Sequence, residues 1–412
     1  MQGTNAYLVD GTRTPFLRAG TGFRDLMSYQ LGAAAIRGLL DKAGLDAGAV
    51  DRVLIGATVS NPRATNVARE AALEAGLPPT VPAVTVTAAG ASATAAVEWG
   101  LDLIATGKAD VVVAGGSDCV SDPPIGYSRE MRTKLLDARR LRGLGDKLRF
   151  LARLRPWDFL PDMPGVTELS TGQTMGEYTE DLAQRLGIRR QDQDEFAARS
   201  HHLAAAAASH LAEEIVPVDG VADREDNGVR PETSVEALAR LKPSFAKDGT
   251  LTAGNSTFLT DGAAVVLLMS EKGLREHLPE RTPKAVFRSA QLIALDLHEE
   301  LLLGPVTAMP RALKAAGIDF ADVDVYELHE AFAAQVLAVT QLLVDAGHPE
   351  LPLAKLNAWG GSLAIGNPFA PNGARLLTTA ANRLGAESGR YALIGTCAGG
   401  ALGHSFIIER YG

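Results

Sequence analysis

Short apolar runs alternate with amphipathic stretches along the first 120 residues. Apolar side chains recur at helical spacing between the short β-branched runs, and this alternation is typical of βαβ units with parallel strands. The sequence therefore predicts an α/β fold for this part. The expected strands are residues 6–9, 53–55, 84–86 and 111–114, and the expected helices are residues 31–43, 64–75 and 92–106.

A similar alternation returns after about residue 285. It comprises strands at 285–288 and 325–328, a helix near 310–316, and a final strand pair at 391–395 and 404–409. The segments ADVVVAGGSD at 109–118 and RYALIGTCAGG at 390–400 are also alike, because each places small residues after an apolar strand. The second half is therefore predicted to repeat the first.

The stretch between the two halves differs in character, with polar helices such as 191–212 and several irregular linkers. A strand at 263–269 follows it and would rejoin the first unit. Because a long structureless loop inside a compact domain is uncommon, the pattern favours an inserted domain. We predict an N-terminal half at 1–122 plus 251–280, an inserted loop domain at 123–250, and a C-terminal half at 281–412.

Composition and charge narrow the class of protein. The chain has 412 residues, of which 46% are hydrophobic and 22% charged, as expected of a globular protein with more than one domain. Its net charge of -9 argues against a nucleic-acid partner. Two cysteines fit a reducing compartment, and neither a signal-peptide pattern nor an apolar run of 18 residues occurs. We therefore expect a cytoplasmic protein.

Ordered motifs along nearly the whole chain resemble the thiolase superfamily, most closely the trifunctional-enzyme β-subunit type of 3-ketoacyl-CoA thiolase. These motifs are RTPF at 13–16, TVT at 85–87, AGG at 114–116, VSDPPI at 120–125, STGQTMG at 170–176, DNGVRP at 226–231, LKPSF at 241–245, TAGNS at 252–256, HEAF at 329–332, WGGSLAIGNPF at 359–369 and CAGG at 397–400.

This resemblance implies a thiolase fold, in which two similar halves form a five-layer αβαβα arrangement with an inserted loop domain. It also implies a homodimer or larger oligomer, and a coenzyme A thioester, or a carrier-bound one, as substrate or ligand. No tightly bound cofactor and no metal site are expected.

Two positions depart from the family pattern. In the family a cysteine at the strand-to-helix turn takes the acyl group, and the histidine of a Gly-His-Pro motif activates it. Here Gly90 stands at the position of the cysteine and Asn367 at that of the histidine. Glycine cannot carry an acyl group, and asparagine can donate a hydrogen bond but cannot act as a base at neutral pH. In the family both residues serve one chemical step, the formation of the acyl-enzyme. We therefore interpret the two replacements together as the loss of that step.

The remaining positions of the family's site are present. His329 matches a residue that helps to form an oxyanion hole, and Cys397 matches the cysteine that moves the α-proton. Gly399 and Gly90 can still offer backbone N–H groups to an oxyanion. A core histidine and an inert buried cysteine are the alternative interpretations of His329 and Cys397. Ser256 and Thr257 match the region that touches the pantetheine arm of coenzyme A, although ordinary turn chemistry explains them equally well.

Residues 127–158 form a basic amphipathic segment in an acidic protein. Its ten arginines and lysines stand against four acidic residues, with leucines at near-helical spacing. A solvated helical face is the ordinary interpretation. The alternatives are docking on an anionic membrane or a partner protein, which we favour by resemblance, and attraction of coenzyme A phosphates.

Three functional hypotheses follow. The first is an enzyme of the thiolase type that makes or breaks a bond at the acyl group without a cysteine acyl-enzyme. The second is a non-catalytic subunit that binds acyl-CoA or serves as a scaffold in a multienzyme complex. The third is a thiolase with a relocated nucleophile at Cys119 or Ser92, although a packing thiol and a helix N-terminal hydroxyl are the simpler interpretations of these two.

Overall fold

The structure is a computed structural model that describes residues 5–59, 61–162, 165 and 167–412. The chain forms two compact units, residues 1–122 with 167–412, and residues 123–166. The predicted inserted domain of 123–250 is larger than this second unit, because residues 167–250 pack with the rest of the chain. The predicted three-part division is a different one and stays a prediction. No helix in the described residues is long and apolar enough to cross a membrane.

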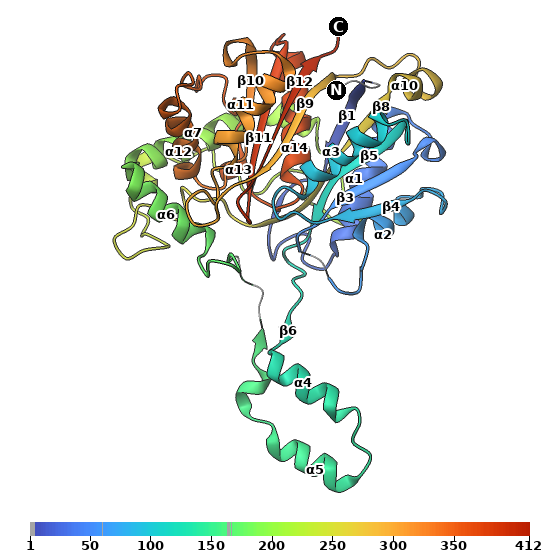
Figure 1. The fold of residues 1–412 in the computed structure, drawn as a ribbon, viewed down its shortest axis with the longest axis vertical. Helices are drawn as coiled ribbons and strands as arrows, with labels where there is room; N and C mark the ends of the chain where they lie inside the picture. Colours follow the sequence, from blue (N-terminus) through green and yellow to red (C-terminus); the bar gives the residue numbers. More distant parts are fainter. Residues whose placement is uncertain (1–4, 60, 163–164, 166) are drawn as a thin grey trace. The chain divides into compact units, whose positions relative to one another are not determined.

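The larger unit is built on one mixed sheet (Figure 1). Its strand order is β10-β11-β12-β9-β1-β8-β5-β3-β4, and the short β2 pairs with β8. The two half-sheets meet where Tyr7 and Leu8 of β1 pair with Val286 and Ala285 of β9. The strands are β1 Ala6–Arg13, β2 Leu17–Arg18, β3 Arg52–Gly56, β4 Ala83–Val86, β5 Val111–Asp118, β8 Thr260–Ser270, β9 Ala285–Ala294, β10 Val323–Leu328, β11 Tyr391–Ala398 and β12 Leu402–Arg410.

Helices cover both outer faces and fill the space between the half-sheets. Three apolar clusters mark these layers, one under α1 and α2, one under α11 and α12, and a central one that contains α3 and α14. This is the predicted succession of helix, sheet, helix, sheet and helix. The helices are α1 Ser28–Ala43, α2 Val67–Glu74, α3 Ser92–Ala105, α6 Met175–Leu186, α7 Arg190–Ala206, α8 Ala208–Ala212, α9 Val235–Leu238, α10 Glu271–His277, α11 Gly304–Ala316, α12 Ala333–Asp345, α13 Ser362–Ile365 and α14 Asn372–Ala386.

The central helices are rich in small buried residues. On α3 these include Ala93, Ala96 and Gly100, and a Cβ at Gly100 would lie 2.8 Å from a methyl carbon of Leu268. Small side chains let a helix approach its neighbours closely, which a helix buried between two half-sheets requires.

The repeat predicted from 109–118 and 390–400 is present in the sheet. Strand β5 lies between a parallel neighbour, β3, and an antiparallel one, β8. Strand β11 likewise lies between the parallel β10 and the antiparallel β12. The two segments therefore have equivalent places in the two halves.

The smaller unit is a helical hairpin closed by a two-stranded ribbon. Helix α5 has no buried residue, and its apolar face carries Leu144, Leu148 and Leu151, which are 76%, 59% and 59% exposed. Within the unit, Lys134 Nζ lies 2.8 Å from a carboxylate oxygen of Asp158. Its elements are β6 Gly126–Tyr127, α4 Arg129–Ala138, α5 Leu144–Arg153, the 3₁₀ helix Pro156–Phe159 and β7 Pro161–Asp162.

Candidate active site

The turn between β4 and α3 is fixed by backbone and hydroxyl groups. Ala89 takes a left-handed conformation with φ of 47°. The Ser92 hydroxyl accepts from the Ala88 N–H at 2.8 Å and donates to the Ala89 carbonyl at 2.6 Å. The Thr58 hydroxyl donates to the same carbonyl at 2.9 Å. No side chain at position 90 takes part in these bonds, so the turn keeps its shape with glycine there.

Gly90 lies against the end of β11. A Cβ at Gly90 would be 3.4 Å from the Cys397 carbonyl oxygen and 3.6 Å from the Ala398 Cβ, which is ordinary contact. A Cβ at Gly399 would in turn lie 3.8 Å from the Ala89 Cβ. The structure therefore brings Gly90, Cys397 and Gly399 together. In the described residues, the Gly399 N–H has no hydrogen-bond partner.

Cys397 is a buried thiol with 3% of its surface exposed. It lies on β11 opposite Gly403 of β12, so the sheet ladder fixes its position. Burial raises the pKa of Cys397 to about 12. The group is therefore mostly a thiol at neutral pH and can give a proton to a carbanion, while its small thiolate fraction is a strong base that can take one.

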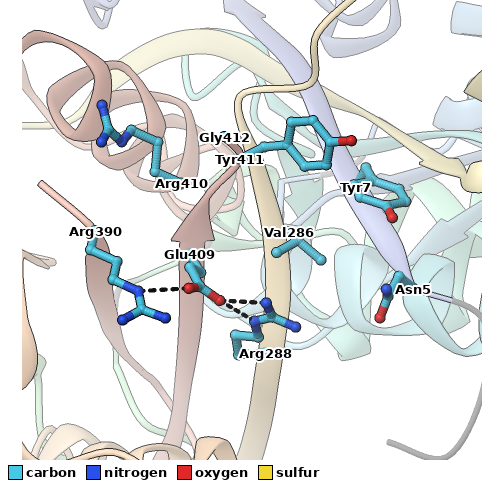
Figure 2. A pocket seen from close by; sticks show the side chains of 9 residues that line it. All are labelled: Asn5, Tyr7, Val286, Arg288, Arg390, Glu409, Arg410, Tyr411 and Gly412. Carbon is cyan, nitrogen blue, oxygen red and sulfur yellow. Dashed lines mark hydrogen bonds and ion pairs between the residues drawn. The ribbon is translucent and has the colours of Figure 1, made fainter. Parts of the chain in front are cut away.

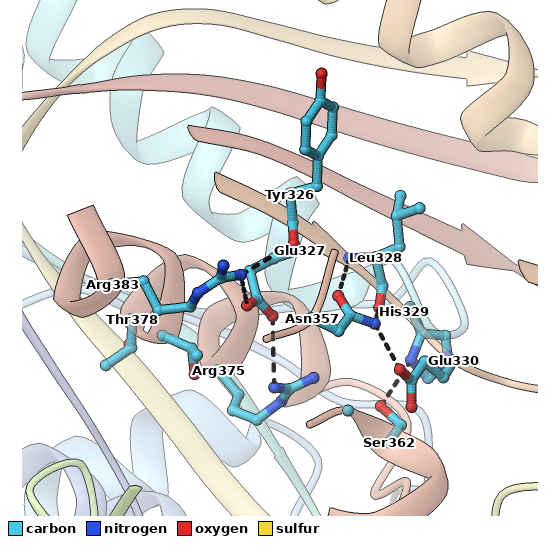
Figure 3. Close-up of polar contacts among 12 residues, drawn as sticks. Tyr326, Glu327, Leu328, His329, Glu330, Asn357, Ser362, Arg375, Thr378 and Arg383 are labelled. Atoms are coloured by element: carbon cyan, nitrogen blue, oxygen red, sulfur yellow. Dashed lines mark hydrogen bonds and ion pairs between the residues drawn. The ribbon is translucent and has the colours of Figure 1, made fainter. Parts of the chain in front are cut away.

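His329 follows β10 and is tied to the same strand end. Its backbone N–H donates to the Gly395 carbonyl at 2.9 Å, and its Nδ1 lies 3.1 Å from the Ser362 hydroxyl oxygen (Figure 3). Burial, with a smaller effect of the Arg375 charge, lowers the pKa of His329 to about 3. The imidazole is thus neutral at physiological pH and can act as a hydrogen-bonding group rather than as a cation.

A buried polar network holds Ser362 at the start of α13. Glu330 accepts from the Ser200 hydroxyl at 2.8 Å, from the Leu363 N–H at 3.2 Å and from Asn357 Nδ2 at 2.6 Å. Because α13 begins at Ser362, these bonds also hold the hydroxyl that meets His329. Glu330 and Ser362 lie within the HEAF and WGGSLAIGNPF motifs, which is a signal for them, but their contacts were not predicted.

Asn367 presents its amide group in one orientation. Its Oδ1 accepts from the Phe369 N–H at 2.8 Å and from Asn372 Nδ2 at 2.6 Å. Since a backbone N–H must meet an acceptor, Nδ2 points the other way. In the part of the chain that the structure describes, this Nδ2 makes no hydrogen bond, so it can donate to a ligand.

Ser256 and Thr257 lie beside the HEAF segment. The Thr257 N–H donates to the Ala331 carbonyl at 3.1 Å, and its hydroxyl donates to the Ser362 carbonyl at 2.8 Å. Ser256 bridges Phe332, and its buried hydroxyl has no partner within the described chain. The Thr257 hydroxyl is therefore used by the fold, while that of Ser256 can still bind a ligand.

Asp118 connects the segments behind the turns at Gly90 and Asn367 and was not predicted. Its Oδ1 accepts from the Thr58 and Val59 N–H groups, both at 2.8 Å, and its Oδ2 accepts from the Ala370 N–H at 3.0 Å. Thr58 supports the turn before α3, and Ala370 follows the turn at Asn367. Burial raises the pKa of Asp118 to about 7, against the lowering effect of these hydrogen bonds.

Cys119, a relocated nucleophile in the third hypothesis, is enclosed. Its Sγ donates to the Leu26 carbonyl at 3.2 Å, and only 1% of the residue is exposed. Burial raises the pKa of Cys119 to about 12, and the charge of Asp261 adds to the rise. A nucleophilic thiol needs a lowered pKa, so this environment favours packing.

A surface hollow of about 420 Å³ lies at the opposite end of β12 from Cys397 (Figure 2). Arg288 and Arg390 line it, and both pair with Glu409. None of the predicted site residues borders it. In the described residues, no group of three or more His, Cys, Asp or Glu side chains could hold a metal ion.

Family models match both halves of the chain, the N-terminal thiolase domain at residues 6–272 and the C-terminal thiolase domain at 281–410. The chain belongs to the thiolase family. It is 42% identical to the human mitochondrial trifunctional enzyme subunit beta, over 99% of this chain and 89% of that protein. It is 41% identical to a probable 3-ketoacyl-CoA thiolase of Caenorhabditis elegans, over 99% and 94% of the two chains.

Solved thiolase structures agree with the fold. The human mitochondrial 3-ketoacyl-CoA thiolase in complex with CoA superimposes with a TM-score of 0.86 at 29% identity, covering 99% of this chain and 98% of that one. The Bacillus anthracis acetyl-CoA acetyltransferase gives a TM-score of 0.87 at 28% identity, covering 99% of each chain. The thiolase fold and the family predicted from the motifs are thereby confirmed.

Proposed function

We propose that this thiolase-family protein acts on an acyl-CoA or carrier-bound thioester without forming a cysteine acyl-enzyme. In this proposal Cys397 moves the proton at the carbon next to the thioester. The backbone N–H groups of Gly90 and Gly399 hold the thioester oxygen, and His329 and Asn367 donate further hydrogen bonds. The supporting observation is the contact of Gly90 with the Cys397 carbonyl oxygen, because it brings the strand end that carries the thiol against the turn that carries the Gly90 N–H.

The relatives support the substrate class. Among them are a probable 3-ketoacyl-CoA thiolase and a thiolase structure that contains CoA. Abstraction of a proton next to a thioester needs a base and donors aimed at the oxygen that becomes an enolate. In this proposal Cys397 is the candidate base, and the N–H groups of Gly90 and Gly399 are the candidate donors.

A relocated nucleophile receives less support. Cys119 is enclosed and its pKa is raised. The Ser92 hydroxyl already bonds Ala88 and Ala89, and this pair of bonds holds the turn itself. A serine nucleophile needs an adjacent base. Neither residue has an arrangement that would activate it.

Hydrogen exchange tests the proposal directly. Acetyl-CoA incubated with the protein in D₂O should gain deuterium at the methyl group, measured by mass spectrometry. Cys397→Ser should slow the exchange by roughly 100-fold or more, the usual contribution of a general acid–base group. Cys119→Ser is the matched control and should leave the rate unchanged, because it alters the other buried thiol.

Two outcomes would contradict the proposal. Binding of acetyl-CoA without any exchange in the wild type would favour the scaffold hypothesis. An acetyl group attached to the wild-type protein, seen by intact mass, would show that a nucleophile exists after all.

We also propose that the hairpin at 127–158 docks on an anionic membrane or a partner protein, and that the chain forms a homodimer in the cytoplasm. The exposed leucines of α5 beside basic side chains support docking, because a basic amphipathic helix binds the interface of anionic lipids. Co-sedimentation with vesicles that contain anionic lipid should exceed that with neutral vesicles, and Leu148→Glu should reduce it. Failure to sediment with either vesicle type would argue for a protein partner.

A further inference from the structure

The carboxylate of Glu168 lies beside the CAGG segment, and no motif in the sequence marks this residue. Glu168 Oε2 accepts from the Gly400 N–H at 2.8 Å. A Cβ at Gly399 would lie 3.7 Å from the same oxygen and 3.8 Å from the Ala89 Cβ. The Glu168 carboxylate therefore borders the space between the turn at Ala89 and the turn that follows Cys397.

The loop before α6 holds Glu168 in place. Its N–H donates to the Gln173 carbonyl at 2.8 Å, and its carbonyl accepts from the Gly172 N–H at 2.8 Å. Thr174 then caps α6, with its hydroxyl accepting from the Glu177 N–H at 3.2 Å. Among the described residues, no Arg, Lys or His forms an ion pair with Glu168, so its charge is not already neutralised by a neighbour.

The proposed function limits the chemistry that such a carboxylate can serve. An acyl-enzyme lets one thiol carrier leave before the next arrives, whereas a site without it must complete the bond cleavage with one thioester bound. A 3-ketoacyl thioester needs a second nucleophile for that cleavage. A 3-hydroxyacyl thioester does not, because removal of the hydroxyl proton releases the electrons that break the C2–C3 bond.

We propose, resting on the proposed function, that Glu168 is the general base for retro-aldol cleavage of a 3-hydroxyacyl thioester. Glu168 takes the proton of the 3-hydroxyl group, and C3 becomes the carbonyl carbon of an aldehyde or ketone. The C2–C3 electron pair moves to C2 and the thioester oxygen, where the N–H groups of Gly90 and Gly399 stabilise the enolate. Cys397 gives its thiol proton to C2. Glu168 then loses a proton to water and Cys397 regains one, so the cycle balances without an oxidant or second thiol.

Glu168→Gln separates this role from a structural one. The glutamine carbonyl can still accept from the Gly400 N–H, but the amide cannot act as a base. With a 3-hydroxyacyl-CoA, the variant should lose roughly 100-fold or more in kcat for formation of the carbonyl product. Its exchange of deuterium into acetyl-CoA should remain within about twofold of wild type, because that reaction uses Cys397 and not the base at the hydroxyl group.

Controls and contrary outcomes distinguish the possibilities. Glu276→Gln, which removes the same charge from the exposed face of α10, should change neither reaction. An equal fall of cleavage and exchange in Glu168→Gln would mean that Glu168 only holds the Gly400 turn, and would overturn the inference. Exchange without cleavage in the wild type would overturn the substrate class alone. Absence of both reactions in the wild type would overturn the proposed function as well.

Discussion

The turn before α3 and the turn after β11 lie against each other, but different forces hold them. The first is closed by the Ser92 and Thr58 hydroxyls, which bond the backbone at Ala88 and Ala89. The second continues from a sheet ladder that pairs Cys397 with Gly403. The first turn has glycine at position 90, whereas the strand that leads into the second carries the buried thiol of Cys397, whose carbonyl oxygen lies against Gly90.

This difference separates two roles that a thiolase-type site combines. In the proposed function, covalent catalysis would depend on a side chain at the first turn, where Gly90 has none. Oxyanion binding depends on backbone N–H groups, whose direction is fixed by the bonds of Ser92 and Thr58. The proposed function therefore needs only the backbone atoms of this turn, because oxyanion binding and covalent catalysis depend on different atoms.

The largest effect is expected from placing a thiol at the first turn, in the double variant Gly90→Cys with Asn367→His. Gly90 has no positive φ, and a Cβ there would meet no atom closer than 3.4 Å, so Gly90→Cys should fit. Asn367→His places an imidazole at this position, and its unprotonated ring nitrogen can take the proton of the new thiol. The double variant should acquire one acetyl group from acetyl-CoA, seen by intact mass.

The two single variants serve as controls for this restoration. Gly90→Cys alone should acylate about 100-fold more slowly than the double variant for want of a base, and Asn367→His alone should not acylate. Subsequent thiolysis of a 3-ketoacyl-CoA by the double variant would show that the pocket fits that substrate. A folded double variant that never acylates would show that loss of the side chains is not the only change at this turn.

The sequence predicted most of the residues at the two turns, but not the residues whose hydrogen bonds hold these turns in place. Gly90, Asn367, His329 and Cys397 were found because each lies in a recognisable motif. Asp118 was not, because its partners Thr58 and Ala370 are 60 and 252 residues away along the chain and no local pattern marks them. Glu168 was missed for the same reason.

For the fold, too, local patterns in the sequence predicted many of the elements but not their long-range packing. The alternation of apolar runs predicted most strands of both halves and several helices, since the period of hydrophobic positions is a local property, but α12 and α14 were not among the expected helices. The packing of residues 167–250 with the rest of the chain could not be predicted in this way, because their helices bury apolar faces against distant segments. Helix α5 illustrates the converse, because a strongly amphipathic sequence buries no residue of the helix.

Asp118→Asn should have a smaller effect, and that effect is on the stability of both turns. Its two carboxyl oxygens accept three N–H groups from the segments behind the turns at Gly90 and Asn367, and both oxygens can still accept when the group is protonated at pH 5. Asparagine can accept on one side only and would turn an N–H donor toward another donor. Asp118→Asn should therefore lower the free energy of unfolding by about 1–3 kcal/mol at pH 5. Asp41→Asn, at an exposed position near the end of α1, is the control and should change it little.

The effect of Asp118→Asn should depend on pH in a definite direction. Burial raises the pKa of Asp118 from 3.8 to about 7 in the folded protein, so the folded state binds this proton more firmly than the unfolded state does. Stability from this group is therefore fully present below about pH 4 and is lost as the pH rises to about 7. Chemical denaturation at pH 5 and pH 8 should show the wild type losing more stability than the variant, which narrows the gap between them. A gap that widens as the pH rises would show that Asp118 is charged throughout, and that its three hydrogen bonds outweigh the cost of burying the charge.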